Sequence, residues 1–189
     1  EEVAILYGDI MGFTKMSEHR PPKEVIDLLN EAYSLVNEVI YEGGGDIDKF
    51  IGDAFLAVHK DPLKAIQISL EIQERLQNKP VKFRLGVHYG LVIRGNVGSG
   101  LRSDNTLIGD TVNTAARIQE VAPPGEVLAS EAVVSKAGIV IPIDYKREMQ
   151  FRGKEEPLIV YNVFRYVKES GRFSDSLTRM AVHLPGSSN

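Results

Sequence analysis

The order of apolar runs along the chain limits the folds it can adopt. Short runs rich in β-branched residues alternate with longer stretches whose apolar residues recur at helical spacing. Read in order, they predict strand, helix, strand, strand, helix and strand. That order matches a ferredoxin-like βαββαβ core, an α+β fold, to which C-terminal α/β additions are joined. Because this architecture hosts many functions, it does not by itself identify an activity.

Start and stop signals bound the expected elements. Asp61-Pro62 combines a capping side chain with proline at the first helical position, and this helix should run to about Gln77. A longer helix over 22–42 should stop at Gly43-Gly44-Gly45. The polar stretch over 98–105 is interpreted as a loop. A third helix is expected over 110–121, and strands over 3–8, 47–51, 54–59, 81–89, 91–97, 126–129, 146–151 and 158–164.

The composition fits one globular domain. The chain has 189 residues, 43% of them hydrophobic and 25% charged, so it can bury a substantial core. Its net charge of −4 argues against bulk nucleic-acid binding, and the lack of cysteine excludes disulfides. Without a bilayer-spanning apolar run or a signal peptide, we expect a cytoplasmic domain that contacts no membrane. The domain should comprise 1–165, followed by an extension or poorly ordered tail over 166–189.

Two aspartates stand where strands end. Asp9 follows the first apolar run, and Asp53 lies at the tip of an expected hairpin. One aspartate in such a place is usually a turn former or a helix cap. In the expected fold the first strand and the hairpin are neighbours, so both carboxylates can converge, and they repel unless a cation lies between them. The pair therefore predicts a divalent-cation site that is completed by phosphate oxygens.

A third segment, Thr-Leu-Ile-Gly-Asp-Thr-Val-Asn-Thr-Ala-Ala-Arg over 106–117, completes the set. With Tyr-Gly-Asp-Ile-Met-Gly-Phe-Thr over 7–14 and Asp-Lys-Phe-Ile-Gly-Asp-Ala over 48–54, it resembles the class III nucleotide cyclases, in the same order and at similar separations. Within that family it resembles the class IIIb adenylyl cyclase subgroup. The resemblance covers about 1–165 and implies the class III cyclase fold. It also implies conversion of ATP to 3′,5′-cyclic AMP and pyrophosphate by a homodimer with two equivalent sites.

The resemblance implies a metal site and a transition-state pair. Asp9 and Asp53, with the backbone carbonyl of Ile10, would hold two Mg²⁺ or Mn²⁺ ions. Asn113 would position the ribose, and Arg117, four residues later on the same helix face, would stabilise charge that develops on the phosphates. Three further cations could reach the triphosphate: Arg102, Arg152 and Lys154. In this family the metal aspartates come from one copy of the domain, and the residues at the positions of Lys49, Thr106, Asn113 and Arg117 come from its partner.

Lys49 and Thr106 match the positions that read the purine in this family. An ammonium can donate to adenine N1, whereas guanine N1 carries a proton and needs an acceptor. The Thr106 hydroxyl can accept from the adenine amino group but can also donate, and many family members have aspartate here. A threonine at this position resembles the pattern of the class IIIb subgroup, some members of which respond to bicarbonate. The offset of four from Lys49 to Asp53 predicts that both side chains share one strand face.

Two alternatives stay open. The first is a guanylate cyclase, against which Lys49 argues. The second is a catalytically silent nucleotide-binding regulator, although such members typically lose a metal aspartate or the Asn/Arg pair, and all are present here. We find neither a phosphate-loop motif nor zinc-spaced histidines, and we interpret His88 as structural. We expect a regulatory domain upstream, in a longer protein that could be membrane-anchored.

Overall fold

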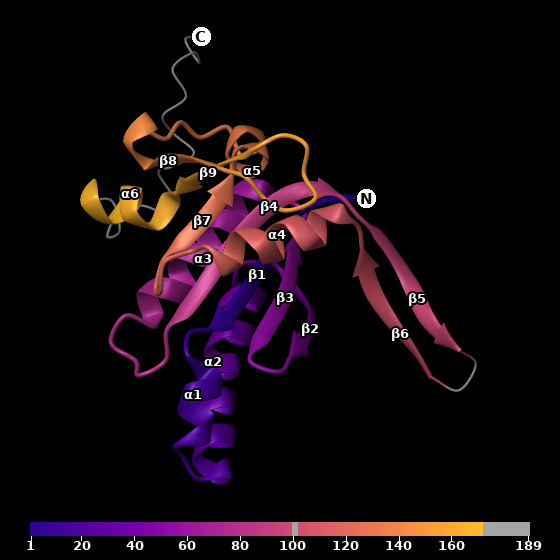
Figure 1. Cartoon of the computed structure of the whole chain (residues 1–189), viewed down its shortest axis with the longest axis vertical. Helices are drawn as coiled ribbons and strands as arrows, with labels where there is room; N and C mark the ends of the chain where they lie inside the picture. The colour runs from indigo at the N-terminus through magenta and orange to yellow at the C-terminus, as the bar shows by residue number, and fades with distance from the viewer. Residues whose placement is uncertain (100–101, 172–189) are drawn as a thin grey trace.

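The computed structural model describes residues 1–99 and 102–171 (Figure 1). Within these residues, seven strands form one mixed sheet in the order β2-β3-β1-β4-β7-β9-β8. All neighbours are antiparallel except β4 and β7, which are parallel. The strands are β1 (Glu2–Ile10), β2 (Asp46–Ile51), β3 (Ala54–His59), β4 (Phe83–Leu91), β7 (Val127–Ser130), β8 (Lys146–Met149) and β9 (Leu158–Asn162). This mixed sheet with helices confirms the expected α+β class.

Helices cover both faces of the sheet. One face packs against α2 (Pro22–Glu42), α3 (Pro62–Arg75), α5 (Glu131–Lys136) and α6 (Val163–Glu169). The other face is crossed by α4 (Asp110–Glu120), as Figure 1 shows. The other described helical elements are α1 (Phe13–Glu18), directly after β1, and the 3₁₀ turn η1 (Ile143–Tyr145). The predicted bounds of α2 are confirmed, and so is the cap of α3, where Asp61 Oδ1 accepts from the Leu63 amide at 2.8 Å.

Strand β1 divides the interior into two cores. Ala4 and Leu6 face the larger core, beneath α2 and α3, while Val3 and Ile5 face a smaller one that contains Ala115 of α4. Because side chains alternate along a strand, the odd-numbered series continues to Asp9 on the α4 side. The alternation that buries the middle of β1 therefore brings a carboxylate out at its end.

Helix α4 lies directly on β4 because Gly86 has no side chain. A Cβ atom at this position would lie 2.5 Å from both the Ala115 carbonyl oxygen and the Gln119 amide nitrogen. The Thr111 hydroxyl fixes the other end of the helix by donating to the Leu91 carbonyl at 2.7 Å. The helix thus has one position against the sheet, and its exposed face is fixed with it.

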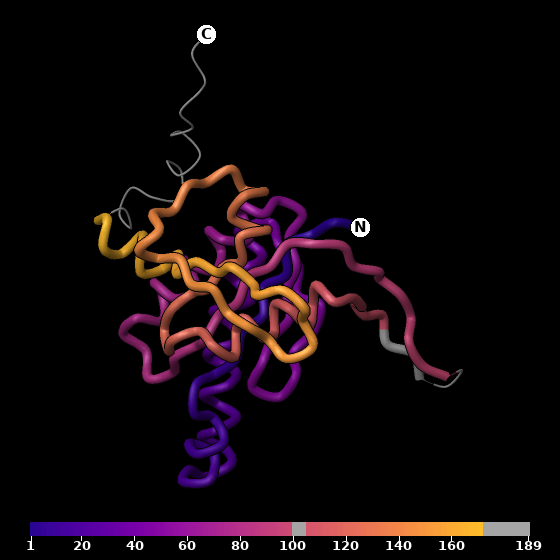
Figure 2. The backbone as a smooth tube through the Cα atoms, turned by 45° about the horizontal axis from the view of Figure 1, so that its top comes forward, coloured from indigo at the N-terminus to yellow at the C-terminus, as the bar shows by residue number. Residues whose placement is uncertain are grey.

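A two-stranded hairpin projects from the body of the domain (Figures 1 and 2). It consists of β5 (Ile93–Ser99) and β6 (Arg102–Ile108), paired along their length from Ile93 opposite Ile108 to Ser99 opposite Arg102. The expectation of a loop is therefore wrong for 98–99 and 102–105, which lie in these strands, and its remaining residues, 100–101, lie outside the described part of the chain. A strand that projects into solvent buries few side chains, so it lacks the alternation by which strands are recognised in a sequence.

The C-terminal part contains short helices that the sequence did not predict. The strand expected over 158–164 ends at Asn162, whose side-chain oxygen accepts from the Arg165 amide at 2.9 Å and caps α6. Helix α6 crosses the expected boundary at 165, and its Val167 is fully buried. Most of the expected tail, 172–189, lies outside the described residues.

Candidate active site

Asp9 and Asp53 lie beside each other at one end of the sheet. Asp9 is opposite Ala54 in the β1–β3 pairing, and the Ile10 amide donates to the Asp53 carbonyl oxygen at 3.1 Å. Gly52, at a φ of 62°, forms the tight turn that puts Asp53 at the hairpin tip, as predicted. The pKa of Tyr7 is raised, mainly by burial and then by the charges of Asp9, Glu120 and Asp53. Both aspartates therefore act on the same phenol.

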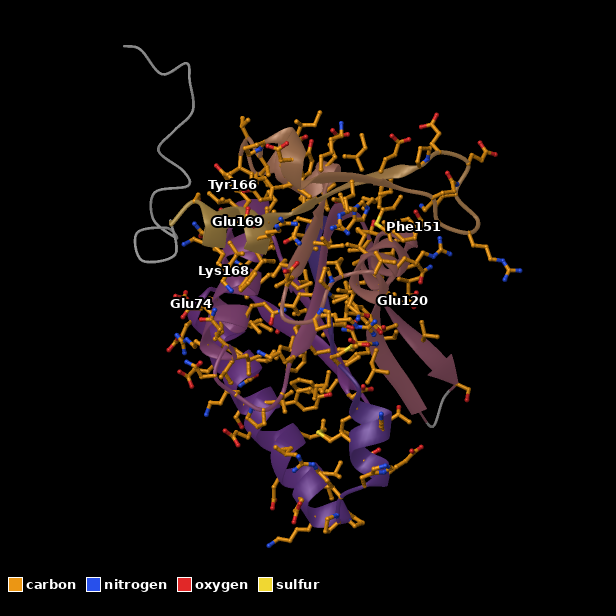
Figure 3. The ribbon with its side chains drawn as sticks, turned by 60° about the vertical axis from the view of Figure 1, so that its left-hand side comes forward. Glu74, Glu120, Phe151, Tyr166, Lys168 and Glu169 are labelled. Carbon is orange, nitrogen blue, oxygen red and sulfur yellow. The ribbon has the colours of Figure 1, made fainter. Side chains whose placement is uncertain are left out.

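A cation that the sequence analysis missed already contacts Asp9. The guanidinium of Arg84, on β4, donates from Nη2 to Asp9 Oδ2 at 2.7 Å and from Nε to Oδ1 at 3.1 Å. Its Nη1 donates to the carbonyl oxygen of Glu120, the last residue of α4, which Figure 3 labels. The bonds to Asp9 raise the pKa of Arg84 most, and the Asp53 charge adds to them. The sequence feature that could have identified Arg84 is that it is a charged residue within the otherwise apolar β4 segment.

Tyr33 of α2 holds the turn that carries Asp53, and it too was missed. Its hydroxyl donates to the Gly52 carbonyl oxygen at 2.5 Å, and its ring packs on Phe50 with centroids 4.2 Å apart. Burial, followed by the Asp53 charge, raises the pKa of Tyr33 to about 12. The phenol therefore stays protonated at neutral pH and remains a donor to the turn.

Lys49 and Thr106 contact each other, although 57 residues separate them in sequence. The Lys49 ammonium donates to the Thr106 hydroxyl, which links β2 to β6. The prediction that Lys49 and Asp53 share one strand face is wrong. Two residues four apart lie on the same face only if the strand continues through both of them. Here β2 ends at Ile51 and the chain turns at Gly52, before Asp53.

Asn113 and Arg117 stand one turn apart on α4, where Asn113 is exposed and Arg117 half-buried. Asp110, at the start of the same helix, binds the ammonium of Lys154. The hydrogen bond from Lys154 is the main cause that lowers the pKa of the Asp110 carboxyl. The structure thus brings Lys154 to α4, a contact between segments that the sequence analysis treated separately.

The other predicted residues are less constrained. Arg152 is exposed in the segment after β8. Arg102 begins β6, but its side chain lies outside the described part of the chain. His88, interpreted as structural, hydrogen-bonds through Nδ1 to Ser130 Oγ at 2.7 Å. Burial is the main cause that lowers its pKa to about 4, so His88 is neutral at physiological pH.

Comparison with known proteins assigns the family. A family model described as the adenylate and guanylate cyclase catalytic domain matches residues 1–164. The chain belongs to this family. Its similarity to the class III cyclases, inferred above from three segments, is thereby confirmed over most of the domain.

The relatives of this cyclase domain include both adenylate cyclases and guanylate cyclases. Adenylate cyclase of Anabaena cylindrica is 31% identical, with 85% of this chain and 36% of that protein covered. Human retinal guanylyl cyclase 1 is 32% identical, with 82% and 15% covered. The crystal structure of the guanylyl cyclase Cya2 has a TM-score of 0.80 at 28% identity, with 86% and 91% covered. The cyclase domain thus spans only a minor part of these two curated relatives.

The donor atoms of the cyclase domain suit a divalent ion that keeps several non-protein ligands. Asp9 and Asp53 supply carboxylate oxygens, and Arg84 already lies against one of them and feels the charge of the other. In the described part of the chain, no group of three or more His, Cys, Asp or Glu side chains could hold a metal ion. Two carboxylates are what Mg²⁺ commonly uses when substrate phosphates complete its shell.

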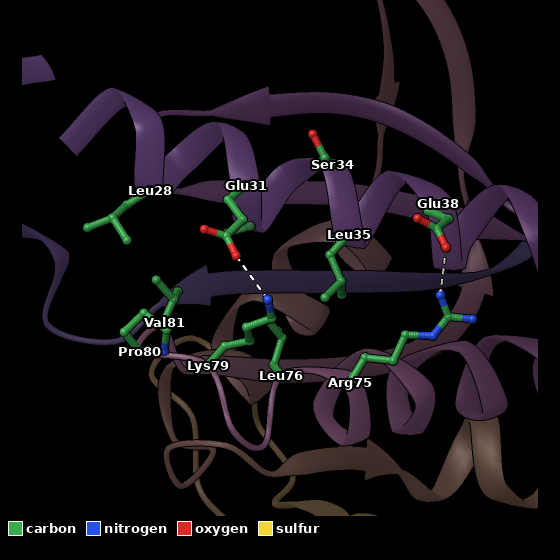
Figure 4. Close-up of a pocket in the computed structure, with 11 residues that line it drawn as sticks. Leu28, Glu31, Ser34, Leu35, Glu38, Arg75, Leu76, Lys79, Pro80 and Val81 are labelled. Atoms are coloured by element: carbon green, nitrogen blue, oxygen red, sulfur yellow. Dashed lines mark hydrogen bonds and ion pairs between the residues drawn. The ribbon is translucent and has the colours of Figure 1, made fainter. Parts of the chain in front are cut away.

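A pocket of the cyclase domain lies away from these residues. A pocket of about 280 Å³ opens between α2 and α3, over Leu28, Leu35 and Leu76. Two ion pairs bridge it, Glu31 to Lys79 at 3.0 Å and Arg75 to Glu38 at 2.9 Å (Figure 4). None of the predicted site residues lines it.

Among the described helices, none is long and apolar enough to cross a membrane.

Proposed function

We propose that this chain is the catalytic domain of an adenylate cyclase. It converts ATP to 3′,5′-cyclic AMP and pyrophosphate by in-line attack of the ribose 3′-oxygen on the α-phosphorus, at sites shared across a homodimer. The 3′-hydroxyl gives its proton to solvent water, the new bond is from the 3′-oxygen to the α-phosphorus, and the bond from that phosphorus to the bridging oxygen of pyrophosphate breaks.

The observation that carries the choice of base is the contact between Lys49 and Thr106. An ammonium has donors only, so it complements adenine N1 and opposes the N1–H of guanine. The Thr106 hydroxyl has two lone pairs, and Lys49 uses one. The second can accept from the adenine amino group. The pair therefore supports ATP as the substrate.

Each remaining site residue has a role in this proposal. Asp9, Asp53 and the Ile10 carbonyl would hold two Mg²⁺ or Mn²⁺ ions, which would lower the pKa of the 3′-hydroxyl and neutralise phosphate charge. Asn113 orients the ribose, and Arg117 stabilises charge on the phosphates in the transition state. The triphosphate is further bound by Arg102, Arg152 and Lys154.

The length of α4 supports a site made by two copies. Lys154 contacts its first residue, Asp110, whereas Arg84, which holds Asp9, bonds its last residue, Glu120. At 1.5 Å per residue, these ends are about 15 Å apart. A lysine and metal ions that bind one triphosphate must lie closer together than that. In a dimer, Lys154 of one copy can meet the aspartates of the other.

A guanylate cyclase is the second candidate. It is favoured by relatives such as Cya2, described as a guanylyl cyclase, and by the Thr106 hydroxyl, which can donate to guanine O6. The same active-site chemistry would then act on GTP.

Turnover of ATP and GTP with Mg²⁺ or Mn²⁺, followed by chromatography of the cyclic nucleotides, tests the proposal. We expect cyclic AMP as the main product, and its loss in Asp9→Ala and Asp53→Ala variants that remain folded. Lys49→Glu with Thr106→Cys should shift the ratio of ATP to GTP use by roughly ten- to a hundredfold, the effect of one mismatched buried hydrogen bond. A wild-type preference for GTP would establish the second candidate, and absence of both products would indicate a silent regulator.

A further inference from the structure

Asp48 occupies an irregular position in β2, next to Lys49. The pairing with β3 shifts between Ile47, opposite Ala57, and Lys49, opposite Leu56, so Asp48 has no opposite residue. Such a bulge re-aims a side chain and is often found beside active sites. The side chain of Asp48 is only 2% exposed, although β2 is an edge strand.

The buried carboxylate of Asp48 is compensated by two cations. Its Oδ2 lies 3.3 Å from the Lys49 ammonium, and its Oδ1 lies 3.7 Å from Nη1 of Arg94 on β5. Among the described residues, Oδ2 accepts no hydrogen bond. A buried carboxylate is strongly unfavourable without a charge partner. For Oδ2, that partner is Lys49.

The contacts of Lys49 leave it one donor for a ligand. Its ammonium carries three N–H groups. One donates to the Thr106 hydroxyl, and a second can point toward Asp48 Oδ2. The third has no partner among the described residues, on a side chain that is 30% exposed. Two fixed partners restrict a four-carbon stem that would otherwise sample many rotamers.

We infer that Asp48 is a positioning residue for purine recognition. Its buried carboxylate holds the Lys49 ammonium against Thr106, so that the remaining N–H points toward purine N1. This inference rests on the proposed function, because it assumes that Lys49 reads the base. Asp48 itself need not touch the nucleotide. It acts by fixing the direction of the Lys49 side chain.

Substitution of Asp48 by asparagine tests this role. We expect the KM for ATP to rise about tenfold, as for loss of one interaction with a charged group, while kcat changes less than twofold. The preference for ATP over GTP should fall by a similar factor. Asp46→Asn is the matched control, since Asp46 lies two residues earlier on the same strand and is exposed. It should leave both parameters unchanged.

A double-mutant cycle distinguishes positioning from a general structural effect. In a Lys49→Met background, Asp48→Asn should have no further effect on the ATP to GTP ratio, because the group it positions is gone. If Asp48→Asn does not fold, Asp48→Glu replaces it in the cycle, because it keeps the charge and displaces the carboxylate by one methylene. We then expect a smaller selectivity loss that also disappears in the Lys49→Met background.

Three results would overturn the inference. They are equal losses with ATP and GTP, effects that add fully to those of Lys49→Met, and an Asp48 variant with unchanged selectivity. Each of these requires a wild-type domain that prefers ATP. A wild-type preference for GTP, or inactivity with both nucleotides, instead rejects the proposed function, so the two failures are distinguishable.

Discussion

Arg84 binds both carboxylate oxygens of Asp9, at 2.7 and 3.1 Å. The guanidinium also feels the charge of Asp53, so it is a monovalent counterion for the pair of carboxylates. Under the proposed function, divalent ions must share or replace this contact. The relationship between Arg84 and Asp9 therefore connects the stability of the site to its occupancy by metal.

Arg84→Gln should make the stability of the domain depend on a divalent ion. Without metal, we expect a loss of about 1–3 kcal/mol, because Asp9 loses its charged hydrogen-bond partner and Asp53 loses a nearby positive charge. Saturating Mn²⁺ should raise the melting temperature of the variant more than that of the wild type, since the ion takes over the neutralisation. Calorimetry with and without Mn²⁺ measures both. Arg165→Gln, which removes an exposed pair with Glu169 on α6, is the control and should show no additional response to Mn²⁺.

Tyr33→Phe should loosen the turn that carries Asp53. The variant loses the bond from the phenol to the Gly52 carbonyl but retains the packing of the ring on Phe50. We expect a stability loss of about 1 kcal/mol and a severalfold increase in the Mn²⁺ concentration needed for half-maximal activity. Tyr41→Phe is the matched control, because Tyr41 lies on the same helix and is 63% exposed. An unchanged metal requirement would mean that the turn keeps its conformation without Tyr33.

Mixing two inactive variants should restore activity if two copies share each site. Asp53→Ala damages the metal side, and Arg117→Ala damages the transition-state side. A heterodimer then has one intact site and one doubly damaged site. With free exchange at equal concentrations, half of the dimers are heterodimers, so about a quarter of wild-type activity should return. Absence of recovery, with heterodimers verified by differential tags, would mean that each chain builds its own site.

His88 should make the domain less stable in mild acid. Its pKa is lowered from 6.5 to about 4 in the folded state, so the unfolded chain binds a proton more readily. Stability should therefore be highest above pH 6.5 and fall as pH decreases from 6.5 to about 4. The loss is of the order of 3 kcal/mol at most. His88→Gln should flatten this part of the urea-denaturation profile between pH 7 and pH 4, whereas His19→Gln, in the exposed segment after α1, should not.

The sequence by itself determined those features that depend on interactions between residues close together in the chain. Helical spacing and capping signals defined α2 and α3, and a glycine that tolerates positive φ marked the turn at Asp53. Because β1 and the hairpin are adjacent in the expected fold, the proximity of Asp9 and Asp53 could also be predicted.

Only the tertiary structure decided which charges meet. Arg84 reaches Asp9 across 75 residues, and Lys154 reaches Asp110 across 44. The sequence around Asp48 has no apolar pattern that predicts the bulge, and the polar sequence of β6 has none that predicts a strand. Local spacing reports which face of an element is buried. The partner of a charge depends on strand order, register and the close approach of α4 at Gly86, and these are set by the packing of the whole chain.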